Sequence, residues 1–167
     1  MESILLCLVI NDFTRMTQQR VRKTTAVFPE MGMNDKRLRD STHTPAILVA
    51  ELELNSRASL SELLRDEGYR VVEAANSSLA VKQLSQEPQI KVILTDLEMP
   101  SWTSIVKHAR ANLPQSFILG MVRYGALSNA LEAQKLGAHA YLIKPLSFNE
   151  VNQWIQRFLT GQSRIKT

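Results

Sequence analysis

The sequence predicts an α/β fold for about residues 45–160, a doubly wound parallel sheet of five strands. Two observations favour it. Helix-like segments separate short apolar runs, which are rich in Val, Ile and Leu and fall at 46–50, 70–75, 90–95, 117–122 and 140–143. The composition changes from irregular to regular near Thr44–Pro45. Right-handed crossovers between parallel strands then build a three-layer sandwich.

The individual elements carry the expected boundary signals. Most of the runs are apolar throughout, as in strands covered on both faces, whereas 70–75 is more polar and suits an edge strand. Pro88 ends one helix, and Gly68 and Gly137 lie where helices take their C-terminal caps.

The last helix has the clearest start. Ser147 and Glu150 match the S-x-x-E pattern of a capping box. An apolar stripe with helical spacing follows them, made of Val151, Trp154, Ile155, Phe158 and Leu159. We therefore expect a helix that packs one wide face on the sheet.

The segments outside this region are less regular. Residues 1–44 form an N-terminal extension or linker, and 161–167 a C-terminal tail. The apolar run from Ile4 to Ile10 is far shorter than the roughly 20 residues that a membrane span needs. Cys7 is the single cysteine, which excludes an intramolecular disulfide and fits a reducing, cytoplasmic setting.

The bulk composition is that of a globular protein with a core. Of the 167 residues, 44% are hydrophobic and 22% charged, and the formal net charge is +4. The basic residues are scattered and lack the concentrated stripe with interleaved aromatics that nucleic-acid binding requires. Neither nucleic acid nor a membrane is therefore an expected partner.

Charged residues follow four of the predicted strands. Glu51 and Glu53 follow the first, Asp96 the third, central strand, Arg123 the fourth and Lys144 the fifth. Singly, each has an ordinary structural explanation, such as a turn cap, a helix cap or a solvated lysine. Because parallel strands end at one edge of the sheet, where such folds bind ligands, we expect these side chains to converge there.

Three segments resemble the receiver domain of bacterial response regulators, over about Pro45 to Leu159. They are ILVAELELNSRASLSELLRDEGYRVVEAANS, VILTDLEMP and KLGAHAYLIKP. The resemblance implies the flavodoxin-like strand order 2-1-3-4-5. It also implies that Asp96 accepts a phosphoryl group from a kinase phosphohistidine, that Lys144 pairs with the phosphoryl oxygens ahead of a cis proline bond, and that Tyr141 is the aromatic switch residue.

The residue types suit that chemistry. A carboxylate can be a covalent phosphoryl acceptor. Charge on the transferred group calls for Mg²⁺ and a cation, and Mg²⁺ prefers oxygen ligands in a near-octahedral array. The resemblance implies that Glu51, Asp96 and the backbone carbonyl of Glu98 contribute to this metal site.

The chain departs from the family pattern at informative positions. Leu52 stands where the second, metal-ligating acid is expected, so we expect Mg²⁺ to bind weakly. Val122 stands at the switch position that usually carries a hydroxyl, and the loop SWTS after Pro100 is shortened and lacks Gly. The side chains of Glu53 and Glu98 are candidate substitute ligands.

The resulting hypothesis is a receiver-like module of a two-component phosphorelay. Only eight residues follow Leu159, so we expect a stand-alone module that acts through protein contacts and is not an enzyme. Its partners would be a sensor histidine kinase or another signalling protein, or a second copy through the fourth helix, fifth strand and fifth helix. Phosphorylation of Asp96 and a phosphorylation-independent pseudo-receiver adaptor remain alternatives.

Two other classes fit less well. A phosphohydrolase with an aspartate nucleophile would want Asp at Glu98, Ser or Thr at Val122, and a cap domain. A flavodoxin-like cofactor binder would need a phosphate loop rich in Ser, Thr and Gly after the first strand. None of the three histidines, His43, His108 and His139, has a spaced partner that indicates a transition-metal site.

Overall fold

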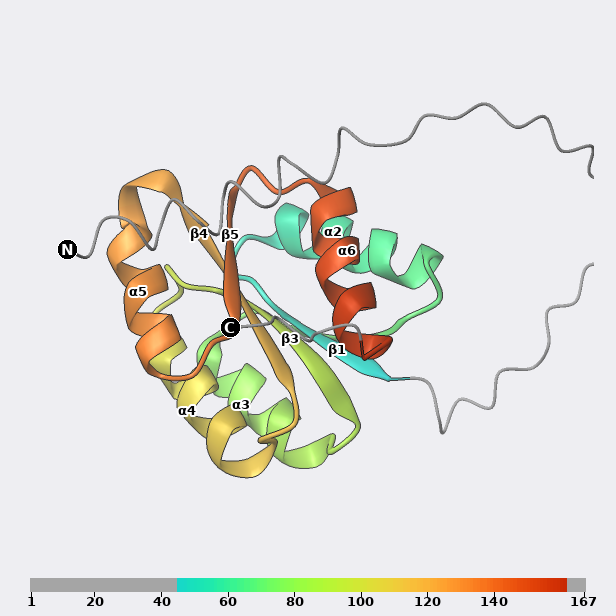
Figure 1. Cartoon of the computed structure of the whole chain (residues 1–167), viewed down its shortest axis with the longest axis horizontal. Coiled ribbons are helices and arrows are strands. Elements are labelled where there is room, and N and C mark those ends of the chain that lie inside the picture. Colours follow the sequence, from blue (N-terminus) through green and yellow to red (C-terminus); the bar gives the residue numbers. More distant parts are fainter. Residues whose placement is uncertain (1–44, 162–167) are drawn as a thin grey trace, which may run out of the picture. The chain divides into compact units, whose positions relative to one another are not determined.

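The computed structural model describes residues 45–161, so the predictions for 1–44 and for the tail beyond Gly161 lie outside the described residues. Its five strands form one parallel sheet in the order β2-β1-β3-β4-β5, which confirms the predicted architecture (Figure 1). The strands are β1 (Ala46–Ala50), β2 (Arg70–Ala74), β3 (Ile90–Asp96), β4 (Phe117–Arg123) and β5 (Ala140–Lys144).

Five α-helices cover the two faces of this sheet (Figure 1). They are α2 (Leu54–Asp66), α3 (Ser77–Gln86), α4 (Trp102–Asn112), α5 (Leu127–Lys135) and α6 (Phe148–Leu159), and a single 3₁₀ turn, η1 (Tyr124–Ala126), precedes α5. Helices α2 and α6 pack on one face, and α3, α4 and α5 on the other. Within residues 45–161, no helix combines the length and apolar character that crossing a membrane requires.

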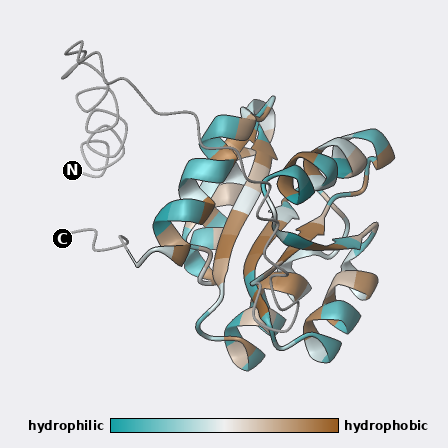
Figure 2. Cartoon of the chain, turned by 90° about the vertical axis from the view of Figure 1, so that its right-hand side faces the viewer, coloured by the Kyte–Doolittle hydropathy of each residue, from teal (hydrophilic) through white to brown (hydrophobic). Residues whose placement is uncertain are grey.

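The core lies in two layers, one on each side of the sheet. Strand β1 is buried along its whole length, with Ile47 facing α2 and α6 and Leu48 facing the other three helices. Figure 2 shows the strands as the hydrophobic centre and the outer helix faces as hydrophilic. Each fully buried aliphatic side chain contributes about 1.5–3 kcal/mol to stability, so the central strands hold the carboxyl edge firmly in place.

The edge strand and the helix ends follow the sequence signals. Strand β2, the more polar run, is an edge strand and only partly buried. Gly68 and Gly137 take positive φ angles of 89° and 105° after α2 and α5, as C-terminal caps do. Helix α3 ends at Gln86, shortly before Pro88.

The predicted capping box of α6 is wrong in one respect. Ser147 is the N-cap residue, as predicted, but the side-chain hydrogen bonds of a capping box do not form. The Ser147 side chain makes no capping hydrogen bond. Instead the Ser147 carbonyl oxygen accepts the backbone N–H groups of Glu150 and Val151, each at 3.1 Å. The backbone therefore closes the first turn without the side chains.

The shortened loop before α4 uses an unusual conformation. Ser101 is the one non-glycine residue between 45 and 161 with a positive φ, 60°, and it precedes α4 directly. This left-handed region normally favours glycine, the residue that the receiver pattern has in this loop. The chain keeps the turn at the cost of local strain.

Candidate functional site

Four charged side chains meet at the carboxyl edge of the sheet. Asp96, Arg123 and Lys144 are the last residues of β3, β4 and β5, and Glu51 directly follows β1. Each of the three strands runs one residue further than its predicted apolar run, because pairing continues through the charged residue. The structure thus brings Glu51, Asp96 and Lys144 together, as the topology requires.

Lys144 joins the two buried acids. Its Nζ lies 2.6 Å from Oε2 of Glu51 and 3.3 Å from Oδ2 of Asp96. Burial by itself would lower the pKa of Lys144, but the hydrogen bond that Lys144 donates to Glu51 and the negative charges of Asp96 and Glu51 outweigh it, so the pKa is raised. The ammonium therefore stays protonated at neutral pH. The bond to Pro145 is cis, as the resemblance implies.

Backbone groups hold the other oxygen of each acid. Oδ1 of Asp96 accepts the N–H of Glu98 at 2.9 Å, and Oε1 of Glu51 accepts the N–H of Glu53 at 3.1 Å. Both carboxylates are buried, with 6% of Asp96 and 3% of Glu51 exposed. Glu51 therefore does not cap α2, the ordinary role weighed for it above.

Arg123 holds the carboxylate of Glu98. Its Nε lies 2.9 and 2.8 Å from the two carboxylate oxygens, its Nη2 lies 2.7 Å from one of them, and its backbone N–H donates to the other at 3.0 Å. The hydrogen bond from Arg123 lowers the pKa of Glu98, and the same bond raises the pKa of Arg123. The sequence places Arg123 after the fourth strand at this edge, but it does not reveal the pairing with Glu98.

The two predicted switch residues lie in the core. Val122 is fully buried on the α3–α4–α5 side of the sheet, and Tyr141 is partly buried against the same cluster. From β4 the residue that reaches the pocket is Arg123, one position further on.

The rim of the pocket comes from the loop after β1. Glu53 is the N-cap of α2 and accepts the N–H of Asn55 at 2.9 Å and that of Ser56 at 2.5 Å. Hydrogen bonds from Ser56, and then from the backbone of Asn55, lower the pKa of Glu53. Leu52 is 56% exposed. The pocket has a volume of about 440 Å³. The described residues that line it are Glu51, Leu52, Glu53, Ser56, Asp96, Glu98, Arg123 and Lys144.

Comparison with known proteins identifies this arrangement. The sequence-family model of the response regulator receiver domain matches residues 47–156, which are most of the residues that the structure describes. The chain belongs to the response regulator receiver domain family. Receiver domains bind Mg²⁺ in their active sites and interact with histidine kinases and phosphotransferases in two-component signalling.

Several relatives share this receiver domain. The chain is 33% identical over 115 residues to the transcriptional regulatory protein ZraR of Escherichia coli, covering 68% of this chain but 26% of that protein. It is 26% identical to sporulation initiation phosphotransferase F of Bacillus subtilis, covering 70% of this chain and 95% of that protein. A receiver domain from Clostridium thermocellum superposes with a TM-score of 0.66 at 26% identity, covering 70% of this chain and 95% of that one.

The donor set of this receiver domain does not fit Mg²⁺ well. Arg123 engages both carboxylate oxygens of Glu98, Glu53 caps α2, and Leu52 offers no ligand. Among residues 45–161, no group of three or more His, Cys, Asp or Glu is arranged to hold a metal ion. Mg²⁺ tolerates little distortion of an octahedral oxygen shell, so neither proposed substitute is positioned as a ligand.

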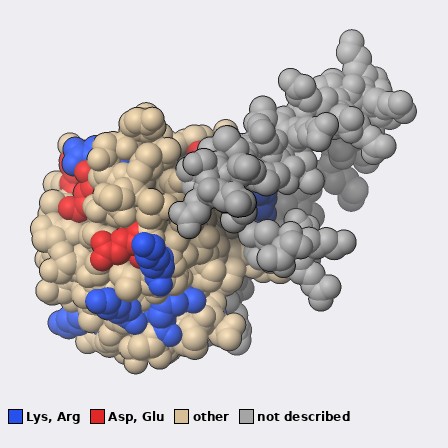
Figure 3. Space-filling view, turned by 60° about the vertical axis from the view of Figure 1, so that its left-hand side comes forward, with Lys and Arg blue, Asp and Glu red and all other residues tan. Residues whose placement is uncertain are grey.

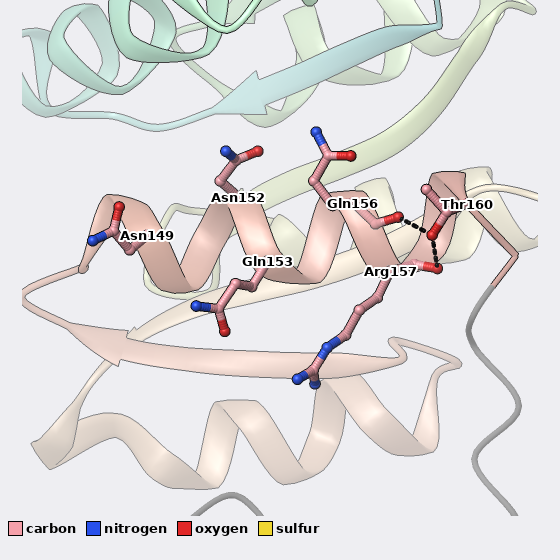
Figure 4. A pocket seen from close by; sticks show the side chains of 6 residues that line it. All are labelled: Asn149, Asn152, Gln153, Gln156, Arg157 and Thr160. Atoms are coloured by element: carbon pink, nitrogen blue, oxygen red, sulfur yellow. Dashed lines mark hydrogen bonds between the residues drawn. The ribbon is translucent and has the colours of Figure 1, made fainter. Parts of the chain in front are cut away.

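A second hollow lies along α6, far from these acids in the sequence. Figure 4 shows its lining, which is mainly side-chain amides: Asn149, Asn152, Gln153, Gln156, Arg157 and Thr160. The Tyr69 hydroxyl donates to Asn152 at 3.1 Å and accepts from Gln156 at 2.5 Å. These amides tie α6 to the loop before β2 and offer no nucleophile.

Charge on the outside is mixed. On the face in Figure 3, most of the basic side chains gather in the lower part of the described surface, and acidic side chains lie above them.

Proposed function

We propose that this chain is a receiver module of a phosphorelay, in which Asp96 accepts a phosphoryl group and the output passes through protein contacts. The observation that carries the proposal is the Nζ of Lys144 between Glu51 and Asp96, 2.6 and 3.3 Å away, at the carboxyl ends of parallel strands. A buried carboxylate beside a fixed cation is suited to accept an anionic phosphoryl group.

The proposed reaction is a displacement at phosphorus. A carboxylate oxygen of Asp96 attacks the phosphorus of a phosphohistidine, and the phosphorus–nitrogen bond breaks with its electron pair going to the ring nitrogen. The product is a mixed anhydride on Asp96. Lys144 neutralises part of the phosphoryl charge, at a distance already set by its bond to Asp96.

The composition of this pocket leads us to expect slow phosphorylation of Asp96. Leu52 removes one carboxylate from the metal site, and Val122 provides no hydroxyl for the phosphoryl oxygens. A hydrogen bond to a charged group is worth about 1.5–3 kcal/mol, which corresponds to roughly tenfold to a hundredfold in rate.

Exposed apolar residues near the pocket support a protein partner. Leu52 and Leu54 are 56% and 63% exposed after β1, and Tyr124, next to Arg123, is 76% exposed. Apolar side chains gathered beside a charged pocket are typical of protein contact surfaces. A kinase or phosphotransferase that delivers its phosphohistidine to Asp96 would cover this rim.

A second candidate function is a phosphorylation-independent adaptor in the cytoplasm. It is favoured by the internal ion pairs, because Arg123 already neutralises Glu98 and Lys144 already neutralises Glu51. With these two acids paired, the pocket keeps one conformation without a phosphoryl group or a metal.

The deciding experiment is intact-mass measurement after incubation with acetyl phosphate and Mg²⁺. The proposal expects a slow gain of one phosphoryl group that Asp96→Asn abolishes and Asp66→Asn, at an exposed aspartate of α2, leaves unchanged. A label that survives Asp96→Asn places the chemistry elsewhere. No label in any variant leaves the adaptor as the function.

A further inference from the structure

We infer that Arg123 supplies the positive charge that a divalent cation would otherwise bring, so that Arg123 and Lys144 together hold the phosphoryl group on Asp96. This inference rests on the proposed function and names the residues that let the reaction run without a metal. It assigns Arg123 as a phosphoryl-binding residue.

The first observation is the position of Arg123. Arg123 and Lys144 are register partners at the ends of the adjacent strands β4 and β5. Both line the pocket that contains Asp96. The negative charges of Asp96 and Glu51 act on Arg123 in addition to its bond with Glu98, and all three raise its pKa. Arg123 therefore belongs electrostatically to the same pocket as the nucleophile.

The second observation is the exposure of its side chain. The side chain of Arg123 is 73% exposed, against 19% for Glu98 and 22% for Lys144. Its guanidinium is held by the carboxylate of Glu98. A change of side-chain rotamer would move the guanidinium from Glu98 to the phosphoryl oxygens.

The third observation concerns the groups in this pocket that could bind a competing cation. Leu52 cannot bind a divalent cation, and the carboxylate of Glu98 is held by Arg123. A guanidinium matches two phosphoryl oxygens with two parallel hydrogen bonds, and a phosphoryl group carries more charge than the Glu98 carboxylate. An arriving phosphoryl group therefore competes with Glu98 for Arg123.

The transfer of the phosphoryl group from acetyl phosphate to Asp96 conserves atoms and electrons without a metal. An oxygen of the Asp96 carboxylate attacks the phosphorus of acetyl phosphate, and the bond from phosphorus to the acetyl oxygen breaks. Acetate leaves with the electron pair, and aspartyl phosphate forms on Asp96. Arg123 and Lys144 pair with the phosphoryl oxygens throughout, and no proton needs to move.

The experiment follows Asp96 labelling by acetyl phosphate with EDTA and with Mg²⁺, using intact mass over time. In EDTA, Arg123→Gln should slow labelling by about tenfold to a hundredfold, the factor for one lost charge-assisted hydrogen bond. Arg123→Lys should recover only part of it, because lysine lacks the paired donors. Glu98→Gln should speed labelling in EDTA, since it frees Arg123.

Arg65→Gln is the matched control, because Arg65 also pairs with a glutamate at 2.7 Å, on α2 and away from the pocket lining. It should leave the rate unchanged. Labelling of the parent only with Mg²⁺, at a rate that Arg123→Gln does not alter, overturns this inference and leaves the proposed function standing. An absence of labelling in the parent under both conditions removes the proposed function and this inference with it.

Discussion

Lys144, the last residue of the edge strand β5, forms an ion pair with Glu51, the residue that follows the interior strand β1, at 2.6 Å between Nζ and Oε2. The lysine is closer to this acid than to Asp96, at 3.3 Å. Glu51 is therefore the residue that fixes the ammonium in place. Asp96 thus lies beside a cation whose position is set by a partner from another strand.

Removing this lysine should destabilise the fold. In Lys144→Met the Glu51 side chain, 4% exposed in the parent, keeps its carboxylate buried with its charge uncompensated. Loss of one member of a buried pair costs on the order of 3 kcal/mol or more in unfolding free energy. Denaturant unfolding measures the loss.

A double variant separates charge from packing. Lys144→Met with Glu51→Gln removes both charges and should recover most of the lost stability, because no buried charge remains. If the double variant is as unstable as Lys144→Met, the loss comes from packing of the lysine stem instead.

A second prediction concerns pH and His139. Its Nδ1 accepts the N–H of Ile118 at 3.0 Å, and its ring stacks on Phe117 with centroids 5.0 Å apart. Burial, and then the positive charge of Arg110, lower the pKa of His139 below 6.5 in the folded state. The unfolded chain thus takes up this proton at a higher pH than the folded one.

The sign of the effect follows from linkage. The contribution of His139 to stability is fully present above about pH 6.5 and is lost as the pH falls from there through the folded-state pKa. Unfolding free energies at pH 7.5, 6.5 and 5.5 should fall less steeply in His139→Asn, which keeps an acceptor but cannot titrate. Equal slopes for parent and variant would mean that His139 titrates alike in both states.

Much of this structure could be predicted from the sequence because its signals are local. The apolar runs place the strands, and topology alone sends Glu51, Asp96 and Lys144 to one edge. The positive φ of Gly68 and Gly137 follows from their place after helices.

The features that the sequence did not predict are side-chain contacts for which more than one partner lies within reach. From the sequence alone, Glu53 and Glu98 are acids near the predicted metal site. In the structure, Glu53 caps the N-terminus of α2 and Glu98 pairs with Arg123. The Ser147 capping box fails for a similar reason, because backbone groups already close the turn. Which partner a side chain takes depends on the three-dimensional positions of the groups, and the spacing of residues in the sequence does not give these positions.

A third prediction concerns the output surface of α5, β5 and α6. Tyr141 and Ile143 lie two residues apart on β5 and so face the same side, toward α5. Ile143 is 43% exposed. We expect a second copy to cover it, so Ile143→Lys should weaken self-association about tenfold, the loss from exposing one aliphatic side chain.

Leu63→Lys is the matched control, because Leu63 is also 43% exposed but lies on α2, across the sheet. Sedimentation velocity over a concentration series should separate the two variants. If Leu63→Lys weakens self-association and Ile143→Lys does not, the contact lies on the α2 side.

The last prediction returns to Leu52 and the metal. Leu52→Asp adds a carboxylate beside Glu51 and Asp96, which supplies a hard ligand and raises the local negative charge, and both effects favour Mg²⁺. Mg²⁺ affinity should rise by about tenfold or more, as expected for one added charged ligand. Trp102, 7% exposed at the start of α4 and six residues beyond Asp96, reports binding through its fluorescence.

Leu52→Asn provides the control, since it offers a neutral oxygen of similar reach and should gain little. Stability gives an independent measurement: Leu52→Asp should unfold more easily than the parent in EDTA, where the acids repel one another, and regain stability with Mg²⁺ by mass action. Because the parent pairs Glu98 with Arg123, its own stability should change little on adding Mg²⁺. Equal Mg²⁺ affinity in the parent and in Leu52→Asp would show that Glu53 or Glu98 leaves its present partner to bind the ion, and that Leu52 does not limit the metal site.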